Sequence, residues 1–195
     1  MPGLNQLKPT DAANSTFHVY NRGIGRAPIF RDAIDRREFI ECFRRYLVPE
    51  VVRARYRRPY KKLGGEVGVL AYCLLDNHFH LVVHQRTATG VQRLMRGALA
   101  GYSRQYNTRY ERTGRLFESP YKASLVTEHR YAKELIAYVH TNHPDQLQHP
   151  FSSHAAYSDP SIAPWLSVSS GLAIFGGLQP YLDYVASYCA RERRR

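Results

Sequence analysis

The pattern of apolar and polar positions along the chain predicts an alternation of strands and helices. Positions 16–21 and 78–84 alternate at every second residue, which is typical of strands with one buried face. The uninterrupted apolar run at 67–75 predicts a fully buried strand. Apolar residues that recur every three or four positions predict three helices, and a short segment between the second and third helices predicts one more strand. The helices are expected at 33–47, 89–110 and 128–142, and the strand at 122–126.

Cap and turn residues place the ends of these elements and fix their order. Asp32 is suited to cap the first helix, and Asp76 with Asn77 is suited to a tight turn between two strands. The order strand, helix, strand, strand, helix, strand, helix predicts an α+β fold. Its first six elements match a ferredoxin-like split βαβ arrangement, an antiparallel sheet with two helices on one face. The other face is left for a ligand or for the last helix.

The same pattern divides the chain into three parts. Residues 1–15 predict a flexible N-terminal tail, and residues 16–145 predict one folded domain. Prolines interrupt the pattern after position 144, so residues 146–195 are expected to form a helical and irregular extension. Two short helices are expected there, at 168–175 and 181–190, before a basic tail that ends the chain.

The net charge points to a polyanionic partner. Lysine and arginine number 28 against 16 acidic residues, which gives a formal charge of +12 and a pI near 9.8. Such a balance favours nucleic acid as the partner, with an anionic membrane surface as the weaker alternative. A third alternative is that the positive charge serves only to keep the protein soluble. The chain also has 15 tyrosines. Basic side chains interleaved with aromatic ones suit single-stranded nucleic acid, because bases stack while phosphates pair with cations.

Other classes of protein are excluded at this stage. No stretch approaches the roughly 20 apolar residues of a membrane span, and the first residues lack the pattern of a secretory signal. The cysteines are three and far apart, at Cys42, Cys73 and Cys189. They fit a reducing compartment, and neither a disulfide framework nor a zinc cluster. The expected location is the cytoplasm, in association with the nucleoid.

The strand at 78–84 carries the most informative chemistry. Strand geometry places His78 and His80 on one face, about 7 Å apart at their Cα atoms, and the apolar residues on the other. Two imidazoles at this spacing can chelate one divalent cation. The alternative is a pair of half-exposed histidines without a ligand. A hydrolytic zinc site fits poorly, because valines stand where its aspartate would follow.

The helix at 128–142 offers the groups that such a site lacks. Tyr138 and Asn142 are four residues apart and therefore share one helix face. An amide oxygen is a hard ligand, so with two imidazoles it suits Mg²⁺ or Mn²⁺. A phenol beside a metal-bound phosphate can attack phosphorus. The alternative is that Tyr138 is only an interfacial aromatic of an amphipathic helix.

Several motifs in order resemble one family of enzymes. The segment LLDNHFHLVV at 74–83 resembles the His-hydrophobic-His signature of the HUH single-strand DNA nucleases. The segments YNRG at 20–23, YN at 106–107, GRLF at 114–117 and YVHTN at 138–142 follow in the order of the HUH single-tyrosine transposases. The segments PFSS at 150–153, with Tyr157, and PWL at 164–166 resemble the REP-associated tyrosine transposase branch. The resemblance covers about residues 16–175.

The resemblance implies a reaction and assigns roles to residues. His78, His80 and Asn142 match the metal ligands, and Tyr138 matches the nucleophile, within a catalytic domain at 16–145. The implied activity is that of a transposase: metal-dependent cleavage and joining of single-stranded DNA near hairpins through a 5′-phosphotyrosine intermediate, with Mg²⁺ or Mn²⁺ and no nucleotide cofactor. The alternative is a non-catalytic, domesticated protein that binds DNA or RNA hairpins on the same fold. Asp76 and His143 depart from the family pattern.

The resemblance and the charge pattern together indicate the DNA contacts. A hairpin-bearing single strand is the expected partner, and no membrane is expected. The C-terminal extension slightly favours a monomer over a homodimer. The residues expected to contact nucleic acid are Arg22, Arg26, Arg53, Arg55, Arg57, Arg58, Lys61 and Lys62.

Overall fold

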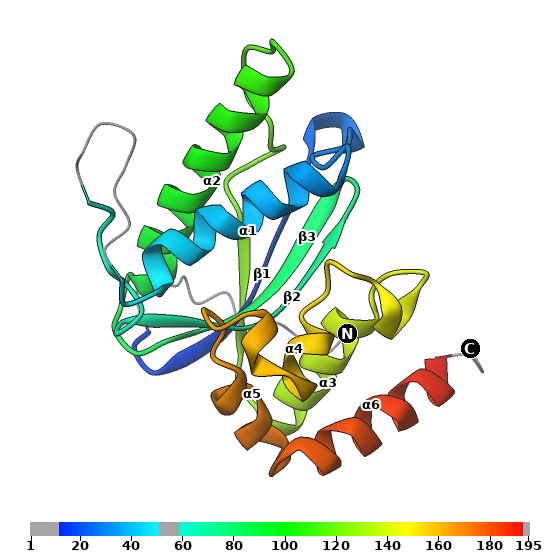
Figure 1. Ribbon diagram of the computed structural model, residues 1–195. Coiled ribbons are helices and arrows are strands. Elements are labelled where there is room, and N and C mark those ends of the chain that lie inside the picture. Colours follow the sequence, from blue (N-terminus) through cyan, green and yellow to red (C-terminus); the bar gives the residue numbers. More distant parts are fainter. Residues whose placement is uncertain (1–11, 51–58, 193–195) are drawn as a thin grey trace.

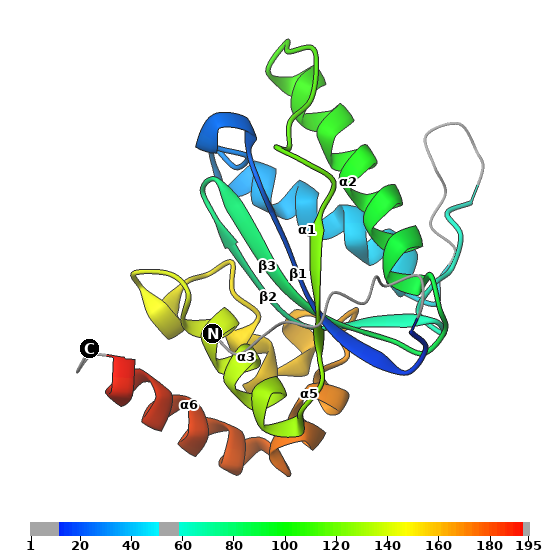
Figure 2. The same cartoon turned by 180° about the vertical axis from the view of Figure 1, so that it is seen from behind.

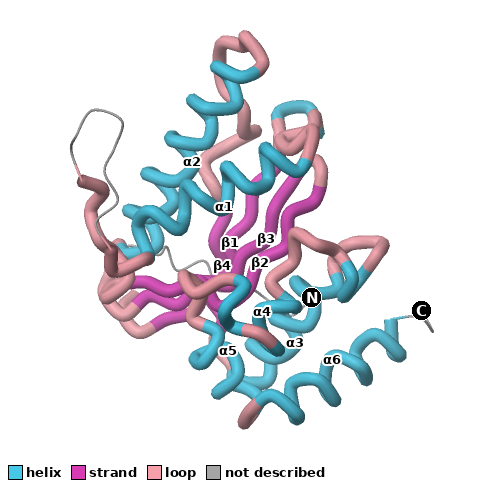
Figure 3. The backbone as a smooth tube through the Cα atoms, viewed as in Figure 1, coloured by secondary structure: helices cyan, strands magenta, loops and turns pink. Residues whose placement is uncertain are grey.

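A four-stranded antiparallel sheet lies at the centre of the molecule, with strands in the order β2-β3-β1-β4 (Figures 1 and 3). This computed structural model describes residues 12–50 and 59–192. The strand order and the antiparallel pairing confirm the predicted ferredoxin-like arrangement. The strands are β1 (Ser15–Arg22), β2 (Val67–Leu75), β3 (His78–Gln85) and β4 (Lys122–Val126).

Helices α1 (Ala33–Leu47) and α2 (Gly90–Arg109) pack together on one face of the sheet (Figure 1). The side chain of Asp32 accepts hydrogen bonds from the first backbone N–H groups of α1, as predicted for a cap. Phe39 of α1 meets Phe79 of β3 with ring centroids 5.0 Å apart, and Tyr102 of α2 meets Phe39 at 5.1 Å. Phe79 is fully buried, so the apolar side of β3 faces this layer as its alternation predicts.

The opposite face of the sheet is covered by α3 (His129–Thr141) and by the C-terminal extension (Figure 2). Helix α3 contacts β2, β3 and β4, while α5 and α6 pack on α3. The last helix starts earlier than expected, because Pro180 lies in its first turn, where a proline is tolerated, and the helix continues to Glu192. The extension consists of α4 (His154–Ser158), α5 (Val168–Phe175), α6 (Leu178–Glu192) and short 3₁₀ turns.

Part of the predicted DNA surface falls outside the described residues. Arg53, Arg55, Arg57 and Arg58 lie there, as do most of the expected N-terminal tail and the last three residues. Among the helices that the structure does describe, none has the length and apolarity needed to cross a bilayer. All three cysteines are buried.

Candidate active site

The face of the sheet opposite α1 and α2 carries a row of polar and aromatic side chains. His80 on β3 pairs with Tyr20 on β1 and with Cys73 on β2, so these three residues lie side by side across the strands. His78 and His18 point to the same face, since strand residues two positions apart share a side. The His78 and His80 ring centroids are 5.2 Å apart. The sheet thus brings the two predicted metal ligands together.

Helix α3 places Tyr138 over this row. Its ring meets that of His80 edge-on, with centroids 5.6 Å apart and an interplanar angle of 81°. It meets the His18 ring in the same way at 6.2 Å. A strongly apolar stripe on α3, which includes Leu135, Ile136 and Val139, is buried and fixes which way the helix faces. The candidate nucleophile is therefore next to the candidate ligands, as the spacing of the motifs implied.

Both ligand histidines use Nδ1 in hydrogen bonds. His78 Nδ1 lies 2.6 Å from Oδ1 of Asn77, an oxygen that only accepts, so Nδ1 carries the proton. His80 Nδ1 lies 2.8 Å from Nε2 of His18. Within the described part of the chain, neither Nε2 has a hydrogen-bond partner. This is the arrangement of metal-bound histidines, in which one ring nitrogen is oriented by a neighbour and the other keeps its lone pair for the ion.

His18 is the site residue that the sequence reasoning missed. Its ring lies beside those of Tyr20 and His80, with ring centroids 4.9 Å and 5.1 Å away. For His80 to offer Nε2 to a metal, its Nδ1–H must donate to His18, which acts as the acceptor. A signal was present, because His18 and Tyr20 alternate with apolar residues in the first predicted strand. Which face they shared with His80 depended on strand pairing, which the pattern alone does not give.

Burial keeps the imidazoles of the site neutral. It lowers the pKa of His18 to about 4. Burial, reinforced by the neighbouring His18 and His78, lowers the pKa of His80 to about 3. The pKa of His78 is also lowered, by burial and then by the charge of Arg22. Neutral rings with oriented lone pairs are the form that binds a cation.

Asn142 follows α3 directly and acts mainly on Tyr138. Burial raises the pKa of the Tyr138 phenol, and the Asn142 side chain partly opposes this by interacting with the hydroxyl. Its Nδ2 atom is buried and has no hydrogen-bond partner among the described residues. An unsatisfied N–H donor fits a group that awaits an acceptor, such as a phosphate oxygen. Asn142 does not line either of the two cavities beside His80 that are described next, so its role as the third metal ligand stays a prediction.

Two cavities open on either side of His80 and Tyr20, which line both of them. The first, of about 420 Å³, we call the arginine cavity, because Arg22 and Arg26 lie on its wall with His78. The second, of about 470 Å³, we call the tyrosine cavity. Its walls include Tyr131, Tyr138 and Tyr188. The two cavities meet at His80 and Tyr20, and Tyr138 lies beside this junction in the wall of the tyrosine cavity.

The predicted basic contacts differ in their surroundings. The Arg22 guanidinium forms an ion pair with Glu118, so part of its charge is already balanced. Arg26 is exposed and has a left-handed backbone at φ 61°, which sets it at the rim of the arginine cavity. Lys62 donates to the carbonyl of Val48, and Lys61 is exposed. Neither lysine lines the arginine or the tyrosine cavity, so both belong to a separate surface.

A sequence model of the family described as "Transposase IS200 like" matches residues 13–142. The chain belongs to the IS200-like transposase family. The match spans all four strands and α3, and it ends at Asn142. Among curated proteins, no match to this IS200-like transposase is found.

Solved structures include a similar fold. One is described as a REP-associated tyrosine transposase bound to a REP hairpin, and it resembles this transposase with a TM-score of 0.51. The alignment covers 85% of this chain and 90% of that one, at 11% sequence identity. At this identity the likeness establishes the fold, and the coverage extends it into the C-terminal extension.

Proposed function

We propose that this transposase is a metal-dependent endonuclease and strand transferase for single-stranded DNA, of the REP-associated type, which acts near hairpins. The observation that carries the proposal is the position of Tyr138 against His80, with no hydrogen-bond partner on Nε2 of His78 or His80 among residues 12–50 and 59–192. The family supports a transposase, and the hairpin in the similar structure supports hairpin DNA as the partner.

The reaction that suits this site is a transesterification at phosphorus. The Tyr138 oxygen forms a bond to the phosphorus of the scissile phosphate, and the bond from phosphorus to the 3′ oxygen breaks. The products are a 5′-phosphotyrosine link and a free 3′-OH, which takes up a proton. Attack by another 3′-OH reverses these steps and joins strands, so no nucleotide cofactor is needed.

The donor set of two neutral imidazoles and one amide oxygen fits Mg²⁺ or Mn²⁺. His78 and His80 would hold the ion through Nε2, and Asn142 would hold it through its amide oxygen. When bound, the ion withdraws charge from the scissile phosphate and orients it. His18 keeps His80 in the required tautomer. Burial of Tyr138 keeps its phenol protonated in the free protein, so the proton must leave when substrate binds.

The test is formation of a covalent adduct with a hairpin-bearing single strand in Mg²⁺ or Mn²⁺. A 3′-labelled strand should shift to the mass of the protein on a denaturing gel, because the protein holds the 5′ phosphate of the downstream fragment. Tyr138→Phe should abolish the shift. Tyr131→Phe, two turns earlier on α3 and in the tyrosine cavity, is the matched control and should keep it.

The histidine variants separate chemistry from binding. His78→Ala and His80→Ala should lose the adduct and retain most hairpin affinity, because they leave the arginines and lysines expected to contact DNA in place. An adduct with Tyr138→Phe would show that another residue is the nucleophile. Tight hairpin binding by the wild type with no adduct in either metal would support the non-catalytic binding protein instead.

A further inference from the structure

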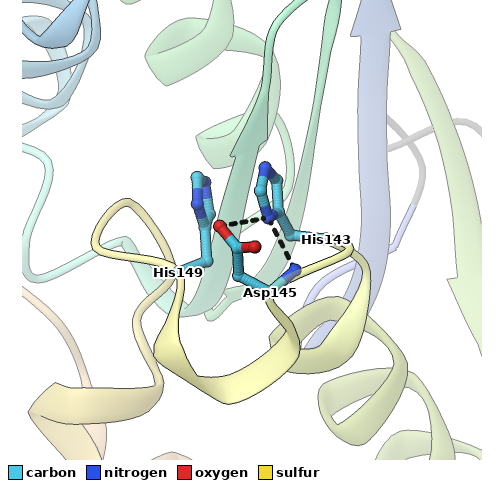
Figure 4. A group of neighbouring side chains, drawn as sticks. All are labelled: His143, Asp145 and His149. Carbon is cyan, nitrogen blue, oxygen red and sulfur yellow. Dashed lines mark hydrogen bonds and ion pairs between the residues drawn. The ribbon is translucent and has the colours of Figure 1, made fainter.

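A second group of ligating side chains lies in the loop after α3, outside the candidate active site. His143, Asp145 and His149 come from one seven-residue segment (Figure 4). Their donor atoms all lie within 4.8 Å of one another. Figure 4 shows the two imidazoles side by side, with the carboxylate of Asp145 next to them. The proposed reaction uses none of these residues.

The hydrogen bonds of this cluster fix the state of both rings. His149 Nε2 lies 2.8 Å from the carbonyl oxygen of Leu74, so Nε2 carries the proton and Nδ1 keeps a lone pair that can bind a metal ion. His143 Nδ1 accepts the backbone N–H of Asp145 at 3.1 Å, so its lone pair becomes available to an ion only when that hydrogen bond opens. The bond from His149 to a carbonyl is the kind of support that orients histidine ligands in metal sites.

The distance between His143 and Asp145 fits a bound cation. His143 Nδ1 and Asp145 Oδ2 are 3.4 Å apart. Two donor atoms on one tetrahedral zinc ion are separated by about 3.4 Å, given metal–ligand bonds near 2.0–2.1 Å. The last carbonyl groups of α3 add negative partial charge beside the cluster.

Two features limit the form of the site. The rings of His143 and His149 are stacked, with centroids 3.7 Å apart and planes 8° from parallel. An ion bonded to both must lie in both ring planes, so one ring has to turn out of the stack. His143 can turn, because its side chain is 21% exposed, whereas His149 is buried and held by Leu74. The nearby Arg36 is paired with Asp76, which balances its charge.

We propose that His143, Asp145 and His149 form a binding site for Zn²⁺, with water as the fourth ligand. Two imidazoles and a carboxylate suit this ion, which also tolerates an open fourth position. The site ties the end of α3, next to Asn142, to the end of β2, one turn before His78. An ion bound there fixes the spacing between the two segments that carry the candidate catalytic ligands.

Zinc binding to the full-length protein tests this proposal without any measurement of DNA cleavage. Protein freed of metal with a chelator is titrated with Zn²⁺ by calorimetry, and bound zinc is counted by mass spectrometry. The His78→Ala/His80→Ala double variant should hold one zinc ion with micromolar or tighter affinity, and the wild type should hold that ion and a second one at His78 and His80. Added to the double variant, His143→Asn or Asp145→Asn should weaken binding at least tenfold.

Matched variants distinguish this site from general histidine binding. His129→Asn removes an exposed histidine from the first position of α3 and should bind zinc as the wild type does. Asp145 is also exposed, so Asp145→Asn keeps the fold and its melting temperature without metal. Substituted Co²⁺ should give the visible absorption of a tetrahedral site. Unchanged zinc affinity in both His143→Asn and Asp145→Asn, or loss of zinc in the His78→Ala/His80→Ala variant alone, would overturn the proposal.

Discussion

The hydroxyl of Tyr181 is expected to hold helix α3, which carries Tyr138, in place. His140, two residues after Tyr138 on α3, is completely buried. Its Nε2 lies 2.8 Å from Ser153 Oγ, and its Nδ1 lies 2.8 Å from the Tyr181 hydroxyl of α6. The same hydroxyl lies 2.5 Å from His154 Nδ1. The substitution Tyr181→Phe removes one oxygen from this network and keeps the ring, which packs against Tyr157 and Phe175.

The size of the effect follows from the groups left without partners. Tyr181→Phe leaves His140 Nδ1 with no hydrogen bond in a site that has no access to water, while the half-exposed His154 can turn to solvent. A buried polar atom without a partner costs about 1–3 kcal/mol. The free energy of unfolding should fall by that amount. In urea this lowers the midpoint by roughly 0.3–1.5 M, with a slope near 2–3 kcal/mol per molar.

The assay is equilibrium unfolding in urea followed by circular dichroism, with Tyr184→Phe as the control. Tyr184 lies on the same helix and packs on Phe175. Its substitution should change the unfolding free energy by less than about 0.5 kcal/mol, as for most surface changes. If Tyr181→Phe matches this control, the network contributes no net stability. If it destabilises by the expected amount, adduct formation by Tyr138 should fall as well.

Three further outcomes are expected. His18→Ala should weaken Mn²⁺ binding about tenfold in calorimetry, with His18→Asn partly restoring it; equal affinities in all three proteins would refute the tautomer argument. Glu118→Gln frees Arg22 and should steepen the salt dependence of hairpin affinity by about 0.9 in log–log slope; an unchanged slope would place Arg22 away from phosphate. Burial lowers the pKa of His140 far below 6.5, so only the unfolded chain takes up its proton as pH falls. Stability measured by urea melts should therefore drop below pH 6.5, by about 1.4 kcal/mol per pH unit for that histidine, and a flat profile would contradict this.

The sequence predicted the sheet and the order of its elements because the local signals agreed with one another. The strand at 122–126 and the helix at 168–175 have the bounds that the pattern gave them, and Asp32 caps α1. The side of β3 that faces the core followed from alternation alone. The fold as a whole followed because few topologies accommodate this order of strands and helices.

The site was predicted only where its residues lie close in sequence or match the motif. His78 with His80 needed only strand geometry, and Tyr138 needed one helix facing the sheet. The pairing of His18 with His80 joins positions 62 residues apart, and nothing local specifies it. The same holds for the bond between His140 and Tyr181, which depends on where the extension packs. Long-range register and docking are tertiary properties, so pattern reasoning does not supply them.

The place of α3 between the sheet and the extension has a consequence for synthesis of the chain. The central strand β1 finds its partners in β3 and β4, which leave the ribosome much later, and His140 finds its partner 41 residues downstream. Contacts of such separation form late, because loop closure must precede them. The helix with the candidate nucleophile is therefore held firmly only after Tyr181 has been translated. A partly made polypeptide would carry the reactive residues without the geometry to cut DNA.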